Sequence, residues 1–436
     1  MKAVKFGGTS VSSAKSIYTV KRIIESDPDR RFIVVSAPGK TDSEDKITDI
    51  LIYAASKSGN ERVKAFEKVE KRFRALCDGL SLNGALDGDL AVIESDLIGA
   101  SADYIISRGE YLTAKLLSRL LGFEFVDAAE IIKFEGGAYD DKQTESICAK
   151  RLSGISCAVI PGFYGGDEKG GIVTFPRGGS DISGAIVARA IAASLYENYT
   201  DVDGFMTCDP RIVQHAEPID ILTYGELSEL LYMGANVLHP EAVFPVRSAN
   251  IPTRILNTFN RKALGTVIVP TAEFLNGGYE RKNKSPVTAI AGKQNLYSLY
   301  IRKSAMSKDV GFIRRLLGCF EDFNIPVENI SSGIDFASVF FCAQEKKTAE
   351  ELTEAVKREA VPDSAYLTAG VSLIAIVGHG IKSRPDVAAR AVNRLCNANI
   401  NLKTIVRSDG EINIIIAVSD IDFERALIAL NGEFEV

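Results

Sequence analysis

The sequence of 436 residues has no tryptophan, only three histidines and seven cysteines. His215, His239 and His379 lie in three separate stretches, and the cysteines form no C-x-x-C pair. Structural zinc sites need clustered cysteine and histidine ligands, and a disulfide framework needs paired cysteines. The sequence therefore predicts neither kind of site, and it nominates no histidine as a catalytic base.

Long apolar runs are absent as well. No stretch approaches the roughly 20 apolar residues that a membrane span requires, and Met1–Phe6 enters a strand-like pattern without a secretory apolar region. Formal net charge is -6, and the lysines and arginines are scattered. We therefore expect a cytoplasmic protein of two to four domains, with no membrane and no nucleic-acid partner.

Three common motifs are missing. No G-x-x-x-x-G-K-[ST] string occurs, which argues against a P-loop, and Gly378-His379-Gly380 lacks the third glycine of a dinucleotide fingerprint. We interpret that string as a turn from a strand to a helix. Ile182 stands where a G-x-S-x-G nucleophile elbow needs its last glycine, so a hydrolase of that type is unsupported.

What is present is an alternation of apolar strands and amphipathic helices. The first 40 residues read as a strand at Ala3–Phe6, a glycine turn, a helix through Ile24 and a strand at Phe32–Val35. Between Asn60 and Cys77 apolar residues recur at helical spacing, and the charges among them predict a solvated helix face. Further strands are predicted at residues 123–126, 157–160, 195–199 and 253–256. The pattern predicts a parallel α/β sheet as far as about residue 270, followed by a polar linker.

An internal repeat follows the linker. Residues 311–330 align with residues 386–405 at a constant offset of 75, which matches Arg315 with Arg390 and Asn324 with Asn399. Each copy has the order strand, helix, strand, strand, helix, strand. This order predicts two ferredoxin-like domains attached to the α/β domain.

Two glycine strings could bind phosphate. Lys5 precedes Gly7-Gly8, and Arg177 precedes Gly178-Gly179, each at the start of a helix whose backbone N–H groups could face an anion. The alternative for the first string is a tight turn with an exposed lysine. Arg177 could hold either a carboxylate or a phosphate with two hydrogen bonds. Two such anion sites in one α/β domain are more telling than one.

Three aspartates, Asp201, Asp203 and Asp209, follow a predicted strand. Carboxylates in such a loop could bind Mg²⁺ or a nucleotide, or they could form turns by accepting backbone hydrogen bonds. For Asp203-Gly204 we favour the turn.

Six strings, taken in order, carry a family resemblance. Residues 5–10, 34–37, 107–110, 177–181, 200–211 and 237–240 occur in the order seen in aspartate kinases of the amino-acid kinase superfamily, and the C-terminal repeat resembles their paired ACT domains. The resemblance implies a carbamate-kinase-like parallel-sheet sandwich followed by two ferredoxin-like ACT domains. It places a catalytic domain at 1–275, with an aspartate-binding lobe at 1–190 and an ATP-binding lobe at 191–275. A linker at 276–288 then precedes ACT domains at 289–365 and 366–436, whose interleaving is left open.

The resemblance implies ATP-dependent phosphorylation of the aspartate side chain, the first step of lysine, threonine and methionine biosynthesis. That carboxylate is ionised at pH 7, so the reaction needs charge neutralisation and alignment more than a base. Lys5, Arg177 and Asp181 would be catalytic, with Gly7, Gly8, Gly178 and Gly179 around the phosphates and Mg²⁺ arriving with ATP. Thr9, Ser36, Thr48, Glu110 and Arg177 would bind aspartate, with Glu110 facing its ammonium.

The nucleotide site would include Thr200, Asp201, Met206, Arg211 and Asn236. Two of these depart from the family, since Asn236 stands where lysine is usual and Met206 where an aromatic residue is common. We hypothesise that Arg211 or another cation compensates.

The first ACT copy would bind a feedback effector, with lysine preferred over threonine. The resemblance places the effector near Met306, Asp309, Gly311, Phe312, Ile313 and Glu328, and Glu328 could hold its ammonium. It also implies a homodimer or homotetramer formed through the ACT domains.

Two other functions remain open from the sequence. One is an amino-acid kinase for another carboxylate, such as glutamate. The other is a non-catalytic amino-acid-binding regulator of the same fold, for which Asn236 is the best argument. Because the chain ends soon after the second repeat, we expect a monofunctional enzyme with no homoserine dehydrogenase domain.

Overall fold

The computed structural model describes residues 1–176, 178–235, 237–407 and 410–436. The chain forms two compact units, which are described separately. The N-terminal unit comprises Met1–Phe205, Pro218–Leu227 and Asn236–Lys282, and the C-terminal unit comprises Met206–Glu217, Ser228–Ala235 and Asn283–Val436. Two short segments from the predicted catalytic region therefore belong to the C-terminal unit.

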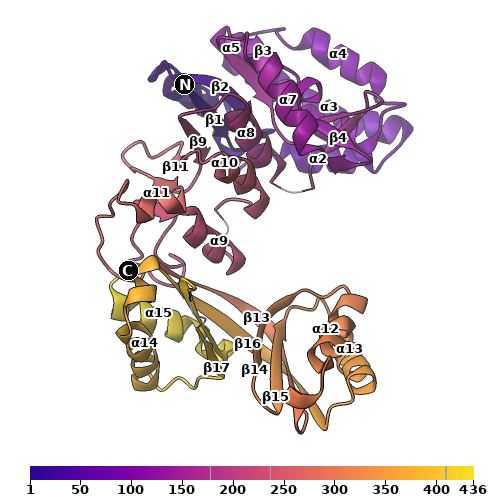
Figure 1. Ribbon diagram of the computed structural model, residues 1–436. Helices are drawn as coiled ribbons and strands as arrows, with labels where there is room; N and C mark the ends of the chain where they lie inside the picture. The colour runs from indigo at the N-terminus through magenta and orange to yellow at the C-terminus, as the bar shows by residue number, and fades with distance from the viewer. Residues whose placement is uncertain (177, 236, 408–409) are drawn as a thin grey trace. The chain divides into compact units, whose positions relative to one another are not determined.

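The N-terminal unit is built on an eight-stranded sheet in the order β10-β12-β11-β9-β1-β2-β6-β3 (Figure 1). Neighbouring strands are parallel except for β11 and β12, which run antiparallel. The predicted parallel α/β sheet is confirmed, with one antiparallel step that the alternation did not indicate. The strands are β1 (Lys2–Phe6), β2 (Arg30–Val35), β3 (Glu124–Phe125), β6 (Ala158–Pro161), β9 (Leu195–Thr200), β10 (Ile221–Thr223), β11 (Thr253–Asn257) and β12 (Thr266–Val269).

Helices cover this sheet, and a main core forms where α1, α3 and α5 pack on β1 and β2. The helices are α1 (Ala14–Glu25), α2 (Ile47–Ala55), α3 (Gly59–Gly79), α4 (Asp87–Asp96), α5 (Ala102–Leu121), α6 (Ala128–Ile131), α7 (Asp141–Leu152), α8 (Gly179–Ala190), α9 (Tyr224–Tyr232), α10 (Phe244–Ser248) and α11 (Thr271–Leu275). Helix α9 begins in the N-terminal unit, and its last residues belong to the C-terminal unit.

A second, four-stranded sheet has the order β5-β4-β7-β8. Its strands are β4 (Lys133–Glu135), β5 (Ala138–Tyr139), β7 (Tyr164–Asp167) and β8 (Ile172–Thr174). The sequence did not predict this sheet, because strands of two to four residues leave almost no periodic pattern to detect.

Helix α3 corresponds to the helix predicted between Asn60 and Cys77. Its apolar residues face the core, with Phe66, Val69 and Phe73 at most 1% exposed. The prediction that its charges form a solvated face is wrong for Arg72, which is only 4% exposed. Arg72 is buried because backbone carbonyls of neighbouring loops surround its guanidinium group.

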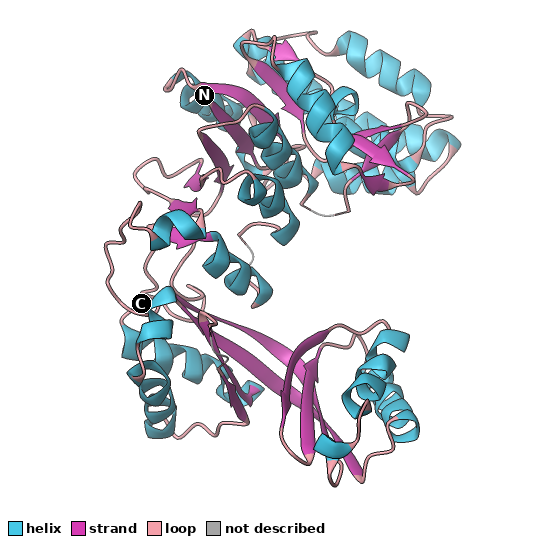
Figure 2. Cartoon of the chain, in the orientation of Figure 1, coloured by secondary structure: helices cyan, strands magenta, loops and turns pink. Residues whose placement is uncertain are grey.

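The C-terminal unit contains one six-stranded antiparallel sheet in the order β14-β15-β13-β16-β18-β17. Figure 2 draws the strands of this unit as magenta arrows and its helices in cyan. Its strands are β13 (Ala289–Arg302), β14 (Val327–Ser332), β15 (Phe336–Phe341), β16 (Ser364–Val377), β17 (Thr404–Val406) and β18 (Asn413–Ser419). Helices α12 (Phe312–Asp322) and α13 (Lys346–Glu359) share one core, whereas α14 (Asp386–Asn397) and α15 (Phe423–Phe434) share another.

Two long strands run through both halves of this sheet. The end of β13 pairs with β15 and with the start of β16, while Ala289–Lys293 at its start pairs with Leu373–Val377. The second ferredoxin-like copy therefore takes its fourth strand from residues 289–293, which lie at the start of the region predicted for the first copy, so the two copies are interleaved.

The backbone supports the 75-residue repeat. Asn324 follows α12 with φ of 52°, and Asn399 follows α14 with φ of 56°. Asparagine tolerates this left-handed conformation better than most residues, so it ends both helices in the same way. Across the described residues, no helix is both long and apolar enough to cross a membrane.

Candidate active site

Lys5 lies near the carboxyl end of β1, where strand pairing sets it opposite Asn198 of β9. Its Nζ is 2.6 Å from Oδ1 of Asp181, and that oxygen also accepts a hydrogen bond of 2.9 Å from the Asn198 amide. The Lys5 side chain is 9% exposed and that of Asp181 18%. The lysine is thus held at the carboxyl edge of a parallel sheet, where open α/β folds bind their ligands.

Asp181 belongs to the first turn of α8, which Gly178 and Gly179 open. Gly178 has φ of 63°, and a Cβ there would lie 2.3 Å from Cβ of His239. A Cβ at Gly179 would lie 2.7 Å from Phe175 and 2.8 Å from the Phe163 ring. Only glycine fits both positions. The N–H groups of Asp181 and Ile182 donate to the Gly178 carbonyl at 2.9 and 3.1 Å, which leaves the N–H groups of Gly179 and Ser180 to face an anion at the start of the helix.

The other glycine pair lies against Lys5 itself. A Cβ at Gly7 would be 3.4 Å from the Lys5 Nζ, and the N–H of Gly7 donates to the Tyr199 carbonyl at 3.0 Å. The two glycine strings, far apart in the sequence, therefore converge on one lysine. A cation beside the first turn of a helix is an arrangement that can bind phosphate.

Glu110 lies on α5 and is only 4% exposed. Its Oε2 has no hydrogen-bond partner within the described part of the chain. Burial raises the pKa of Glu110 to about 7, although the Ala37 backbone N–H, Lys46 and Arg108 oppose this shift. A buried carboxylate oxygen without a partner is costly, so this group is suited to receive a cationic ligand.

The predicted nucleotide residues Thr200 and Asp201 lie at the carboxyl end of β9. Oδ2 of Asp201 accepts from the Thr9 hydroxyl at 3.3 Å, and its Oδ1 accepts from the Thr200 hydroxyl at 3.2 Å. Asp203 accepts hydrogen bonds from Asn257 and Asn260 at 2.7 and 2.9 Å, and Gly204 has φ of 123°. Both donors are side-chain amides, so these contacts hold Asp203 against the end of β11 and the loop after it, and the turn at Asp203-Gly204 stays a prediction.

The other predicted residues lie in several places. Ser36 and Thr48 are half-buried, in the loop after β2 and in the first turn of α2. Met206 and Arg211 belong to the C-terminal unit, and Arg211, whose side chain is 85% exposed, pairs with Asp209 at 2.6 Å. Arg177 and Asn236 lie outside the described residues.

The predicted effector residues divide between core and surface. Met306 and Phe312 are buried in the core under α12, and Ile313 packs against that core. Gly311, with φ of 89°, precedes α12, and Asp309 pairs with Arg315 at 2.8 Å. The Glu328 carboxylate lies 2.8 Å from Nζ of Lys293.

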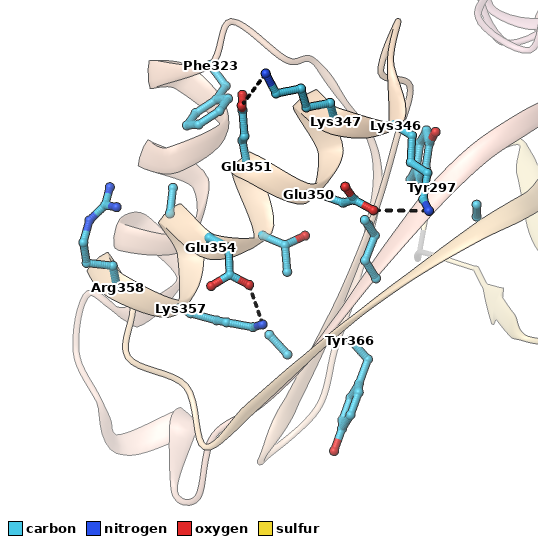
Figure 3. Close-up of a pocket in the computed structure, with 15 residues that line it drawn as sticks. Tyr297, Phe323, Lys346, Lys347, Glu350, Glu351, Glu354, Lys357, Arg358 and Tyr366 are labelled. Carbon is cyan, nitrogen blue, oxygen red and sulfur yellow. Dashed lines mark hydrogen bonds and ion pairs between the residues drawn. The ribbon is translucent and has the colours of Figure 1, made fainter.

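A separate groove of about 990 Å³ lies beside α13 in the C-terminal unit (Figure 3). None of the six predicted effector residues lines it. Its charges are largely paired along the helix, with Lys346–Glu350 at 3.3 Å, Lys347–Glu351 at 3.7 Å and Lys357–Glu354 at 2.7 Å. These exposed pairs are typical of a solvated helix face.

Sequence reasoning missed several residues at the site. Asn198 meets Asp181 only because β1 and β9 pair in a particular register, which no local pattern reveals. Gly39 packs on Gly8, and the only signal for it was a Pro-Gly turn after β2. No histidine was nominated as a catalytic base, and nothing in the sequence indicated that His239 packs over Gly178.

Comparison with known proteins places these features in a family. A profile described as the amino acid kinase family matches residues 1–257, and an ACT domain profile matches residues 374–434. Aspartokinase 3 of Bacillus subtilis is 31% identical, with 100% of this chain and 98% of that protein aligned. The chloroplastic aspartokinase 1 of Arabidopsis thaliana is 29% identical, with 99% and 79% aligned.

Solved structures agree in fold. The aspartate kinase of Clostridium acetobutylicum has a TM-score of 0.92 and 35% identity, with both chains covered completely. Aspartokinase III of Escherichia coli, solved in complex with aspartate and ADP, has a TM-score of 0.77 at 22% identity, again over the whole of both chains, and supports the fold alone. These matches confirm the resemblance seen in the sequence: the chain belongs to the amino acid kinase family and, within it, to the aspartokinases.

Proposed function

We propose that this chain transfers the γ-phosphoryl group of ATP to the side-chain carboxylate of L-aspartate, forming 4-phospho-L-aspartate. The observation that carries the proposal is the convergence of both glycine strings on Lys5, on the same sheet edge as the loop that contacts Glu110. The surroundings of Lys5 form an anion site, and the Glu110 carboxylate is suited to bind an ammonium group. ATP and an amino acid supply these two charges.

The reaction requires little proton transfer. The aspartate carboxylate is ionised at neutral pH and can attack directly once the negative charges are neutralised and aligned. Lys5 stabilises the transferring phosphoryl group together with the N–H groups that open α8. Asp181 and Asn198 keep the Lys5 amine in place.

Substrate and metal binding complete the proposal. Glu110 faces the substrate ammonium and Arg177 its α-carboxylate, while Thr200 and Asp201 lie on the nucleotide side. No group of three or more His, Cys, Asp or Glu in the described ranges is arranged to hold a metal. We assign Mg²⁺ to the ATP phosphates, where it would neutralise charge on the transferring group.

Regulation is proposed for the C-terminal unit. We assign residues 1–275 to catalysis, 276–288 to a linker, and 289–365 and 366–436 to two ACT domains that sense an amino acid, with lysine preferred over threonine. The two domains are interleaved, because residues 289–293 complete the sheet of the second copy and β16 crosses the boundary at residue 365. In this structure the Glu328 carboxylate forms an ion pair with Lys293. When the effector binds, its ammonium group takes the place of Lys293 at that carboxylate. We further propose a cytoplasmic enzyme that associates as a homodimer or homotetramer through these domains.

The test is ADP release from ATP and Mg²⁺ with aspartate, glutamate or acetylglutamate as acceptor. Lys5→Met removes the amine at the site. Lys2→Met removes an amine from the same strand, where it pairs with Asp27 and Glu197, and serves as the matched control. Turnover with aspartate alone, lost only in Lys5→Met, supports the proposal. Turnover with another acceptor alone would identify a different kinase, and binding of aspartate without turnover would indicate a regulator.

A further inference from the structure

Arg72 is a buried cation on α3 whose contacts are mainly backbone oxygens. Its Nη2 donates to the Ser12 carbonyl at 3.1 Å and to the Gly39 carbonyl at 2.5 Å, and its Nη1 donates to the Asp45 carbonyl. Its Nε forms an ion pair with Glu44 at 3.1 Å. One guanidinium group therefore joins three points on two loops.

Both loops belong to the candidate active site. Ser12 ends the short 3-10 helix Thr9–Val11 that follows Gly8. Gly39 donates to the Gly8 carbonyl at 2.9 Å, and a Cβ on Gly39 would lie 2.9 Å from the carbonyl carbon of Gly8. The loop after β2 is thus packed, glycine against glycine, on the predicted phosphate-binding turn.

The same loop also reaches the substrate side. The backbone N–H of Ala37, two residues before Gly39, faces the Glu110 carboxylate and acts to lower its pKa. Gly109, the neighbour of Glu110, packs so closely on this loop that a Cβ there would lie 2.7 Å from that of Ala37. The segment from Ala37 to Gly39 therefore contacts both the phosphate turn and the carboxylate that we assign to the substrate ammonium.

We propose that Arg72 is a positioning residue for phosphoryl transfer, which holds the loop at residues 37–39 against Gly8 and so fixes the spacing between the phosphate-binding turn and Glu110. The inference rests on the proposed function. A planar guanidinium can donate to several carbonyls in fixed directions, whereas a lysine amine is a single flexible point. Simple packing at this position would be achieved at lower cost by an apolar side chain, because burying a charge is unfavourable.

The test compares Arg72→Lys with Arg62→Lys. Arg62 lies on the same helix and donates to the carbonyls of Lys57 at 2.9 Å and Leu97 at 2.7 Å, but it contacts neither loop of the site. Both variants lose a guanidinium that binds carbonyls, so general destabilisation affects both. If Arg72→Lys does not fold, Arg72→Gln serves in its place, since its amide still donates to a carbonyl.

Two readouts are used below the unfolding temperature. With saturating ATP and aspartate, kcat of the Arg72 variant should fall by about tenfold or more, because small errors in alignment slow a positioned reaction strongly. Arg62→Lys should stay within about twofold of wild type. Amide hydrogen exchange should rise in residues 7–12 and 36–46 of the Arg72 variant alone.

The outcomes separate the two proposals. A kcat for the Arg72 variant close to wild type, or an equal loss in Arg62→Lys, overturns the positioning role while the kinase assignment stands. A wild-type protein that releases no ADP with aspartate overturns the kinase assignment. Hydrogen exchange then still decides whether Arg72 holds the loop at residues 37–39 against Gly8, since a rise confined to the two segments supports this and no rise refutes it.

Discussion

Replacing Glu110 by glutamine should make the protein more stable and a poorer enzyme. Glu110 is 4% exposed, and burial raises its pKa from the ordinary 4.5 to about 7. The folded protein therefore keeps this carboxyl protonated over a pH range in which the unfolded chain would ionise it. The contribution of neutral Glu110 to the free energy of unfolding is fully present below pH 4.5, where both states carry the proton. It is lost as the pH rises through about 7.

The size of the effect follows from the two pKa values. A pKa difference of 2.5, from 4.5 to about 7, corresponds to about 3 kcal/mol. Glutamine does not titrate, so the stability gain of Glu110→Gln over wild type should be near zero at pH 4.5. It should grow by about 1.4 kcal/mol per pH unit and level off at about 3 kcal/mol above pH 7.

Substrate binding should show the opposite preference. Only the ionised carboxylate attracts an ammonium, and with a pKa of about 7 it is about nine-tenths ionised at pH 8 and about one-tenth ionised at pH 6. The kcat/KM for aspartate should therefore fall about tenfold from pH 8 to pH 6, whereas kcat changes less because bound ammonium favours the ionised form. Glu110→Gln should give a low, flat profile.

The assay is urea denaturation of both proteins at pH 5 and pH 8, together with kcat/KM for aspartate across the same range. Wild type is the reference for both measurements. A variant of Asp181, the other carboxylate of the site, would not serve as a control because Asp181 forms an ion pair with Lys5. An equal stability difference at the two pH values would refute the burial argument. A flat wild-type kcat/KM profile would refute the assignment of Glu110 to the substrate ammonium.

Three further predictions concern other parts of the molecule. Gly178→Ala should lower turnover by about 100-fold or more, because the new Cβ would clash with His239. Adding His239→Ala should restore only part of the turnover, because the left-handed backbone conformation at residue 178 remains. Steady-state kinetics of the single and double variants tests this. Arg281→Met should destabilise the protein by about 3–5 kcal/mol, because the fully buried Glu226 loses an ion-pair partner. Thermal unfolding should show a lower melting temperature, and an unchanged melting temperature would contradict this prediction. Tyr232→Phe removes a hydrogen bond of 2.6 Å to a backbone oxygen of β14, and it should change the effector concentration for half-inhibition several-fold while basal kcat stays constant. Equal inhibition curves would exclude a regulatory role for that bond.

Local patterns predicted much of the fold. The alternation of apolar strands and amphipathic helices led to the parallel sheet, and a constant offset of 75 residues led to the repeated domain. Both are recoverable because each element carries its own periodicity. The antiparallel step at β12 and the four-stranded sheet were not predicted, since strand direction and very short strands leave no local signature.

The site, like the fold, was predicted only where its residues stand in local sequence patterns. Lys5, the glycines and Glu110 stand in contiguous strings, so the resemblance found them together. Arg72 contacts both loops of the site, yet it was interpreted as part of a solvated face. Helical periodicity identifies apolar positions and cannot identify a charge that backbone carbonyls will surround.

Because β13 and β16 run through both halves of the C-terminal sheet, the two halves do not correspond to two consecutive stretches of sequence. A cut between residues 365 and 366 falls inside β16, and any fragment that begins after β13 lacks the strand formed by Ala289–Lys293. Neither half can therefore be exchanged with a relative's as one contiguous insert. A chimera with altered effector specificity would have to transfer the region from residue 289 to the last strand as one cassette, and recombination points within it would leave an open sheet edge prone to aggregation.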